Sequence, residues 1–134
     1  MIRLYTDAAT KGNHGIGGIG ILVVAPGVHD QTHAPLPEMS NHEAEFAAAK
    51  AGFERLLALK LSGMVSYRSD SRLVIDALNK GYAKHYATEL TELLAVVDRF
   101  DPVICQWIPE RQNHGAHALA QQGLHQAETS AGGA

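Results

Sequence analysis

Two hydrophobic periodicities alternate along this sequence, and their order restricts the folds that the chain can adopt. Segments in which apolar and polar residues alternate, or in which β-branched residues cluster, predict strands, whereas apolar residues three or four positions apart predict helices. The predicted strands are 2–6, 18–24, 28–33, 64–69 and 103–108, and the predicted helices are 41–61, 71–79, 89–100 and 115–127. This order predicts an α/β fold in which a mixed sheet is flanked by helices.

Short local signals support several of these boundaries. Ser40 and Glu43 have the spacing of a capping box at the start of the longest helix. Pro26-Gly27 marks a turn before the 28–33 strand, which is otherwise poor in strand formers. Gly52 lies inside the longest helix, where glycine costs about 1 kcal/mol relative to alanine, so we expect another element to approach closely there.

The length and composition predict one soluble domain. The 134 residues, 46% of them hydrophobic, suffice for a single core over 1–127, and the small and polar residues 128–134 predict a flexible tail. No segment approaches the ~18 apolar residues of a membrane helix, and the N-terminus enters a predicted strand directly, so we expect no membrane partner and no export. Cys105 is the single cysteine, which favours a cytoplasmic setting without a disulfide-linked partner.

Three acidic residues occupy positions that the predicted fold could bring together. Asp7 and Asp70 each follow a predicted strand, and Glu45 lies on the apolar side of the helix 41–61, whereas Glu43 is explained by the capping box. Each aspartate also has a structural explanation, because Asp7 could start a turn and Asp70 could cap the following helix. The three acids considered together favour a shared site.

Clustered carboxylates repel one another and raise one another's pKa values, and a bound Mg²⁺ or Mn²⁺ relieves that repulsion. Two such ions about 4 Å apart can activate a water and stabilise the leaving oxygen of a phosphodiester, with Asp7 as the expected bridging ligand. The composition does not itself favour a nucleic-acid partner, because the formal net charge is −3 and the pI is near 6.2.

His117 is a fourth candidate, at the start of the last helix and on its inward face. An inward histidine is often a hydrogen-bonded core residue, so His117 could be either a member of the site or a core residue.

Two apparent motifs are set aside. The segment 15–20 spells GxGxxG but leads into a strand instead of the helix that cradles a pyrophosphate, and His114-x-x-His117 lacks the further ligands of a zinc site.

Four segments resemble, in order and spacing, those of the type I ribonuclease H family, and together they span nearly the whole chain. Residues 5–15 resemble the TDG(A/S)xxGNPG motif, 40–46 the TNNxAEY segment, 69–74 the TDSQLV segment and 108–120 the VPREENxxADxLA segment. The resemblance implies a ribonuclease H-like fold, with a five-stranded sheet of three antiparallel strands followed by parallel ones. It also implies that Asp7, Glu45 and Asp70 are the catalytic acids that hold Mg²⁺ or Mn²⁺.

The last of these segments departs from the family pattern at His117, which stands where an aspartate usually helps to hold the second metal ion. A neutral imidazole can ligate Mn²⁺ or move a proton, but it brings no negative charge. We therefore expect His117 to be the fourth catalytic and metal-binding residue, with activity that is weakened or shifted toward Mn²⁺.

The resemblance also assigns substrate contacts to Gly12, Asn13, Asn41, Ser71 and Arg72. Such contacts distinguish RNA from DNA through the 2′-hydroxyls near the scissile phosphate and require little sequence specificity. Some members grip the hybrid with a basic helical handle, and the corresponding stretch here carries only Lys80, Lys84 and His85. Together with the acidic pI, this predicts weak and strongly salt-sensitive binding.

Three hypotheses remain open at this point. The first is a metal-dependent endonuclease that hydrolyses the RNA strand of RNA–DNA hybrids. The second is a catalytically weak or inactive ribonuclease H-like domain that binds nucleic acid or a protein partner, as His117 and the missing handle suggest. The third is an unrelated mixed-sheet enzyme such as a nucleotide-binding protein, which only the glycine string favours.

Overall fold

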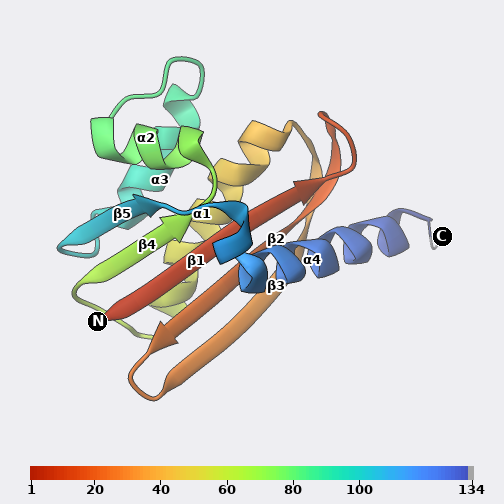
Figure 1. Ribbon diagram of the computed structural model, residues 1–134. Coiled ribbons are helices and arrows are strands. Elements are labelled where there is room, and N and C mark those ends of the chain that lie inside the picture. Colours follow the sequence, from red (N-terminus) through yellow and green to blue (C-terminus); the bar gives the residue numbers. More distant parts are fainter. Residues whose placement is uncertain (133–134) are drawn as a thin grey trace.

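A five-stranded sheet with the order β3-β2-β1-β4-β5 forms the centre of the molecule in a computed structural model that describes residues 1–132 (Figure 1). The strands β1 (Ile2–Thr10), β2 (Gly15–Ala25) and β3 (Val28–Met39) are antiparallel neighbours. β4 (Val65–Ser69) runs parallel to β1, and β5 (Val103–Trp107) runs parallel to β4. The predicted mixed sheet is confirmed, including its change from antiparallel to parallel pairing.

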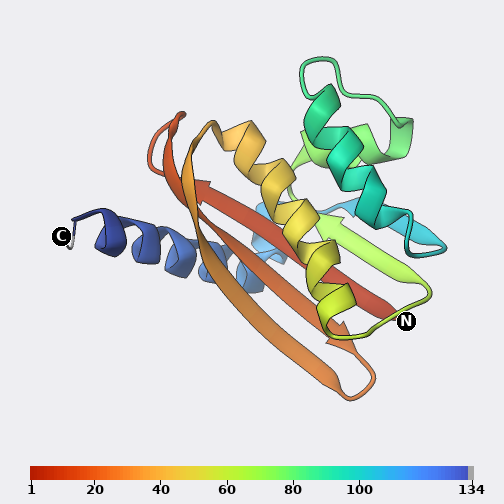
Figure 2. The same ribbon diagram turned by 180° about the vertical axis from the view of Figure 1, so that it is seen from behind.

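Helices cover both faces of this sheet (Figures 1 and 2). α1 (Asn41–Ala58), α2 (Arg72–Lys80) and α3 (Ala87–Val97) lie on one face, with α1 against β1 and β2. The single helix α4 (His114–Gly132) crosses the other face over β1, β2 and β3, after a short 3₁₀ turn at Glu110–Gln112. The main core lies under α1, where Phe46, Phe53 and Leu56 are buried against Leu4 and Val65.

Three strands are longer than predicted, and β2 begins at Gly15 and not at Gly18. β1 continues to Thr10 and not to Thr6, because Asp7–Thr10 pair with the glycine-rich segment Gly17–Gly20 of β2. β3 continues to Met39 although Pro35 and Pro37 lie within it. A strand at the edge of a sheet tolerates proline because one side of its backbone makes no ladder bonds, and β3 is such an edge.

α1 begins and packs as the sequence predicts. The Ser40 hydroxyl accepts a hydrogen bond from the Glu43 backbone N–H, and the Glu43 carboxylate accepts one from the Ser40 N–H, which completes the capping box. A Cβ on Gly52 would lie 2.6 Å from Cγ2 of Thr6, so this glycine allows β1 to pass close beneath the helix. The capping box and the close approach at Gly52 are confirmed, whereas the helix ends at Ala58 and not at Leu61.

The glycine string of β2 serves the packing of α4. The string lies in a strand, as expected, and a Cβ on Gly18 or Gly20 would collide with the α4 backbone at Leu124 and Ala116. Gly123 of α4 approaches the same strand, since its Cβ would lie 3.0 Å from Cα of Gly18. Glycines on both elements therefore let α4 lie almost directly on the sheet, which is a structural reason for the GxGxxG pattern.

α4 extends further than the sequence predicts. The helix was expected to end at Ala127, with a flexible tail from residue 128, but it continues to Gly132. Side chains near its end contact the β1–β2 loop and the sheet, since Glu128 forms an ion pair with Lys11 of the loop at 3.1 Å and Gln126 hydrogen-bonds His33 of β3 at 2.7 Å. The expected flexibility of residues 133–134 lies outside the described residues.

Cys105 lies half-buried on β5, and burial raises the pKa of its thiol to about 11, which disfavours the reactive thiolate form. Within residues 1–132, no helix combines the length and the apolar character needed to cross a membrane.

Candidate active site

Asp7 lies in the interior of β1, where it pairs with Gly20 of β2 and is only 4% exposed. The alternative that it starts a turn is therefore wrong, because the strand continues for three more residues. A buried carboxylate in the middle of a sheet is costly unless charged or polar partners surround it. The partners of Asp7 come from α1, from the end of β4 and from α4.

Asp70 follows the last residue of β4, and Glu45 faces the same region from the first turns of α1. Asp70 is not the cap of α2, because the Ser71 hydroxyl accepts the hydrogen bond from the Val74 backbone N–H. Glu43 is engaged in its capping box, which leaves Glu45 as the inward acid of α1. Glu45 and not Glu43 therefore faces Asp7 and Asp70, as helical geometry predicted.

The three carboxylates meet in one cluster. One oxygen each from Asp7, Glu45 and Asp70 lie within 4.8 Å of one another. Burial, followed by the charge of Asp70, raises the pKa of Asp7 to about 6, although hydrogen bonds from His117 and from Ala8 oppose the shift. Burial, together with the charges of Asp7 and Asp70, raises the pKa of Glu45 well above its ordinary value.

These shifts indicate what the cluster can bind. Three acids held this close favour partial protonation unless a cation neutralises them. An oxygen-only donor set suits hard divalent cations such as Mg²⁺ or Mn²⁺ and does not suit zinc, which prefers sulfur and nitrogen ligands. The residues present therefore fit a divalent metal ion held by Asp7, Glu45 and Asp70.

His117 is brought to the cluster from the first turn of α4. Its side chain is 40% exposed, and its Nδ1 lies 2.9 Å from Oδ2 of Asp7. Next to it, Asn113 is buried and donates through Nδ2 to the backbone oxygen of Thr6 at 2.9 Å. Asn113 thereby ties the start of α4 to β1 at the residue before Asp7.

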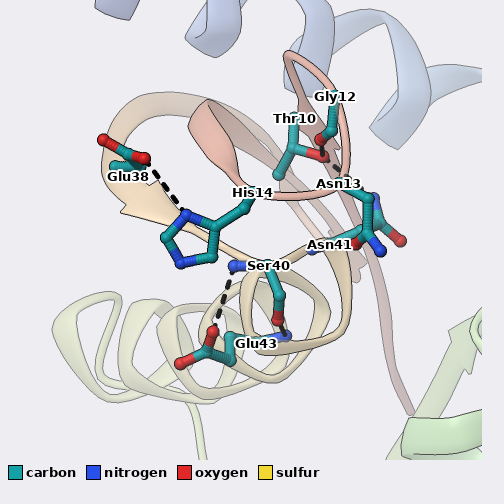
Figure 3. Close-up of polar contacts among 8 residues, drawn as sticks. All are labelled: Thr10, Gly12, Asn13, His14, Glu38, Ser40, Asn41 and Glu43. Carbon is teal, nitrogen blue, oxygen red and sulfur yellow. Dashed lines mark hydrogen bonds and ion pairs between the residues drawn. The ribbon is translucent and has the colours of Figure 1, made fainter.

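The β1–β2 loop lies beside the N-terminus of α1 (Figure 3). The Asn41 backbone N–H donates to Oδ1 of Asn13 at 3.4 Å, and the Thr10 hydroxyl donates to the Gly12 carbonyl at 2.7 Å. Thr10, Gly12, Asn13, Asn41 and His42 line an open cavity of about 460 Å³. The predicted contact residues Gly12, Asn13 and Asn41 are therefore gathered at one groove.

The other two predicted contact residues lie at the start of α2. Ser71 is buried and its hydroxyl caps the helix, so its side chain already has a structural task. Arg72 is exposed, and its guanidinium lies over the Trp107 ring at 3.9 Å from the ring centroid. Trp107 also donates through Nε1 to the backbone oxygen of Asp70 at 3.1 Å.

Comparison with known proteins gives the family of this chain. Residues 5–123 match the family described as reverse transcriptase-like. The ribonuclease H of Desulforamulus reducens is 34% identical over 135 residues, which cover 90% of this chain and 83% of that protein. The EbsB protein of Enterococcus faecalis is 39% identical over 127 residues, or 92% of this chain and 94% of its own length. The chain belongs to the ribonuclease H family.

Solved structures of ribonucleases H share the fold. The N-terminal ribonuclease H domain of a Mycobacterium tuberculosis protein matches with a TM-score of 0.88 at 22% identity, over 97% of each chain. LC11-RNase H1, solved in complex with an RNA/DNA hybrid, matches with a TM-score of 0.85 at 24% identity, over 95% of this chain and 99% of its own. The predicted ribonuclease H-like fold and enzyme family are confirmed.

This ribonuclease H has a short connection where some members carry a basic handle. α2 ends at Lys80, Gly81 follows with a φ of +70°, and α3 begins at Ala87. Lys84 and His85 are exposed in the connection. The predicted absence of a full handle agrees with this direct link between α2 and α3.

Trp107 was not among the residues predicted from the sequence, although it contacts Asp70 and Arg72 in this ribonuclease H. A half-buried tryptophan at the end of a strand needs a partner for its indole N–H, and this requirement was a usable signal. The strand pairing places Trp107 beside Ser69, so its ring adjoins Asp70.

Proposed function

We propose that this protein is a metal-dependent endonuclease that hydrolyses the RNA strand of RNA–DNA hybrids. The observation that carries the proposal is the cluster of Asp7, Glu45 and Asp70, whose oxygens lie within 4.8 Å of one another in a member of the ribonuclease H family. Divalent ions at this cluster would supply positive charge for water activation and for the leaving oxygen in phosphodiester hydrolysis. We propose Mg²⁺ or Mn²⁺ as the ions, and a cytoplasmic setting.

The residues around the cluster would orient the hybrid. Gly12, Asn13 and Asn41 offer backbone amides and side-chain amides at one groove, and such groups can hydrogen-bond 2′-hydroxyls of an RNA strand. The solved complex of LC11-RNase H1 with an RNA/DNA hybrid supports this choice of substrate. These contacts reach the sugar and the backbone, so we expect cleavage with little sequence preference.

A cleavage assay tests the proposal. The wild-type protein should cut the RNA strand of an end-labelled hybrid in Mg²⁺ or Mn²⁺, and Asp70→Asn should lower the rate by at least about 10³-fold because a ligand and a charge are lost. Asp76→Asn, which removes an exposed acid from α2, is the matched control and should retain the wild-type rate. No cleavage by the wild type in either metal, or equal cleavage by Asp70→Asn, would contradict the proposal.

A second candidate is a catalytically weak or inactive domain that only binds nucleic acid or a protein. The hydrogen bond between His117 and Asp7 favours it, because that bond engages an oxygen that a metal ion would otherwise share. Under this hypothesis the wild type binds the hybrid but does not cleave it, even in millimolar Mn²⁺. The same assay, with binding measured in parallel, distinguishes the two candidates.

A further inference from the structure

Trp107 contacts both the second aspartate of the cluster and the arginine that follows it. Its Nε1–H donates to the Asp70 backbone oxygen at 3.1 Å, and its ring faces the Arg72 guanidinium at 3.9 Å. The next N–H, that of Ser71, donates to the Ser69 hydroxyl at 3.0 Å. The peptide group between Asp70 and Ser71 is thus hydrogen-bonded at both its oxygen and its nitrogen, which fixes the backbone that carries the Asp70 carboxylate.

Arg72 occupies a position that does not favour a cation. It is the first residue of α2, and the positive end of the helix dipole disfavours a positive charge there. No carboxylate within residues 1–132 forms an ion pair with it. The stack on Trp107 is therefore the contact that holds the guanidinium in place, and stacking leaves the N–H groups at its edge free to bind an anion.

We propose that Trp107 is a positioning residue of this site, which holds Asp70 through its indole N–H and holds Arg72 through its ring so that the guanidinium binds a phosphate of the nucleic-acid strand. The inference rests on the proposed function, because the phosphate belongs to a bound hybrid. Arginine matches phosphate with paired N–H groups, and a guanidinium that is already oriented loses little side-chain freedom on binding.

The single tryptophan of the chain makes this inference measurable without catalysis. Titration of an RNA–DNA hybrid in EDTA should change the fluorescence of Trp107 in a saturable way, because phosphate binding alters the stacked guanidinium. Arg72→Gln should weaken binding about tenfold and should lower the slope of log Kd against log salt by about one. Arg99→Gln, which removes an exposed cation beyond the end of α3, should leave both quantities within about twofold of wild type.

Variants of Trp107 separate its two contacts. Trp107→Leu should lose affinity as Arg72→Gln does, and the double variant should bind no more weakly than either single one, because both changes remove the same contact. Trp107→Phe keeps an aromatic face and loses the N–H, so it should largely retain affinity while kcat falls and KM changes little. Circular dichroism checks the fold, and if Trp107→Leu is unfolded, Trp107→Phe and Arg72→Gln still decide.

Four results would overturn the inference. They are wild-type affinity and salt slope in Arg72→Gln, wild-type kcat in Trp107→Phe, additive losses of affinity in the double variant, and Trp107 fluorescence that does not respond to saturating hybrid. Each can occur while the wild type still cleaves the hybrid and Asp70→Asn does not, in which case the proposed function stands. A wild type that neither binds nor cleaves the hybrid would overturn the proposed function as well.

Discussion

Asp7 shows how a single residue can be costly to the fold and useful to the site. It is 4% exposed, and this burial, followed by the charge of Asp70, raises its pKa to about 6. A group that binds its proton more tightly in the folded protein than in the unfolded chain reduces stability when the pH removes that proton. The acid cluster therefore makes stability and metal binding depend on pH in a defined direction.

We expect the free energy of unfolding in EDTA to fall as the pH rises from about 4 to about 6, because unfolded Asp7 has already lost its proton while folded Asp7 still holds it. Glu45, with its raised pKa, contributes in the same direction. Metal ions bind the ionised acids, so the stabilisation by Mg²⁺ should grow over this interval. Thermal unfolding with and without Mg²⁺ measures both effects.

Asp7→Asn is the control for this pH dependence. Asp30 and the other acids are present in both proteins, so their contributions to stability cancel when the stability of the variant is subtracted from that of the wild type. The difference in stability between wild type and variant should fall with rising pH. A difference that increases with pH between about 4 and about 6 would show that Asp7 is not destabilised by its surroundings.

His117→Asp should raise the affinity for Mg²⁺ about tenfold and increase Mg²⁺-dependent cleavage, because it adds an anionic oxygen ligand where an imidazole now bonds Asp7. The extra charge should also lower the melting temperature in EDTA. His114→Asp adds the same charge at an exposed position three residues away and should change neither the Mg²⁺ affinity nor the Mg²⁺-dependent cleavage appreciably. Unchanged Mg²⁺ dependence in His117→Asp would assign His117 a structural role only.

Some residues of the site could be predicted from the sequence and others could not, for physical reasons. Asp70 and Glu45 could be identified because the end of β4 and the inward face of α1 follow from local periodicity. Asp7 was selected from the end of a predicted strand, but it lies inside β1. Trp107 was missed because its role depends on the pairing of β5 with β4, which only the assembled sheet brings about. His117 was placed on the inward face, but its bond to Asp7 depends on how close α4 lies to β2.

At the level of elements, the close approach of α4 to the sheet decides where His117 lies. Gly20 pairs with Asp7 in the β1–β2 ladder and faces the first turns of α4 at Ala116 and Ala120. The end of β1, the start of β2, the end of β3 and the end of α4 depend on such partners and were predicted incorrectly. The end of α1 and both ends of α3 were also misplaced, by two or three residues. The capping box of α1 is local in sequence, and the start of that helix was predicted correctly.

Gly20→Ala should destabilise the protein by about 3 kcal/mol, because the new methyl group meets backbone atoms of α4 that cannot move aside individually. Separation of α4 from β2 should also weaken the His117 contact to Asp7. Gly27→Ala is the control: it has a φ of +73° and nothing within 4 Å, so it should cost about 1 kcal/mol through backbone strain alone. Urea unfolding of the two variants measures the difference, and equal costs would contradict the close packing of α4.

For the whole molecule, charge and substrate are poorly matched. The net charge is −3, the hybrid is a polyanion, and the connection between α2 and α3 offers few cations near the groove. Affinity then depends on a small number of phosphate contacts, each of which adds to the salt dependence. Composition predicts this mismatch but could not reveal the site, because three carboxylates and one guanidinium barely alter the net charge.

His85→Lys should therefore improve hybrid binding severalfold at low salt and increase the slope of log Kd against log salt by about one, if the α2–α3 connection faces the nucleic acid. His85 is exposed, so the substitution should not disturb the fold. Ser62→Lys adds the same charge before the N-terminal end of β4, roughly 16 Å of strand away from Asp70, and should give a smaller gain. Equal gains from both lysines would mean that net charge alone limits binding, whereas a gain confined to His85→Lys would place the connection against the bound hybrid.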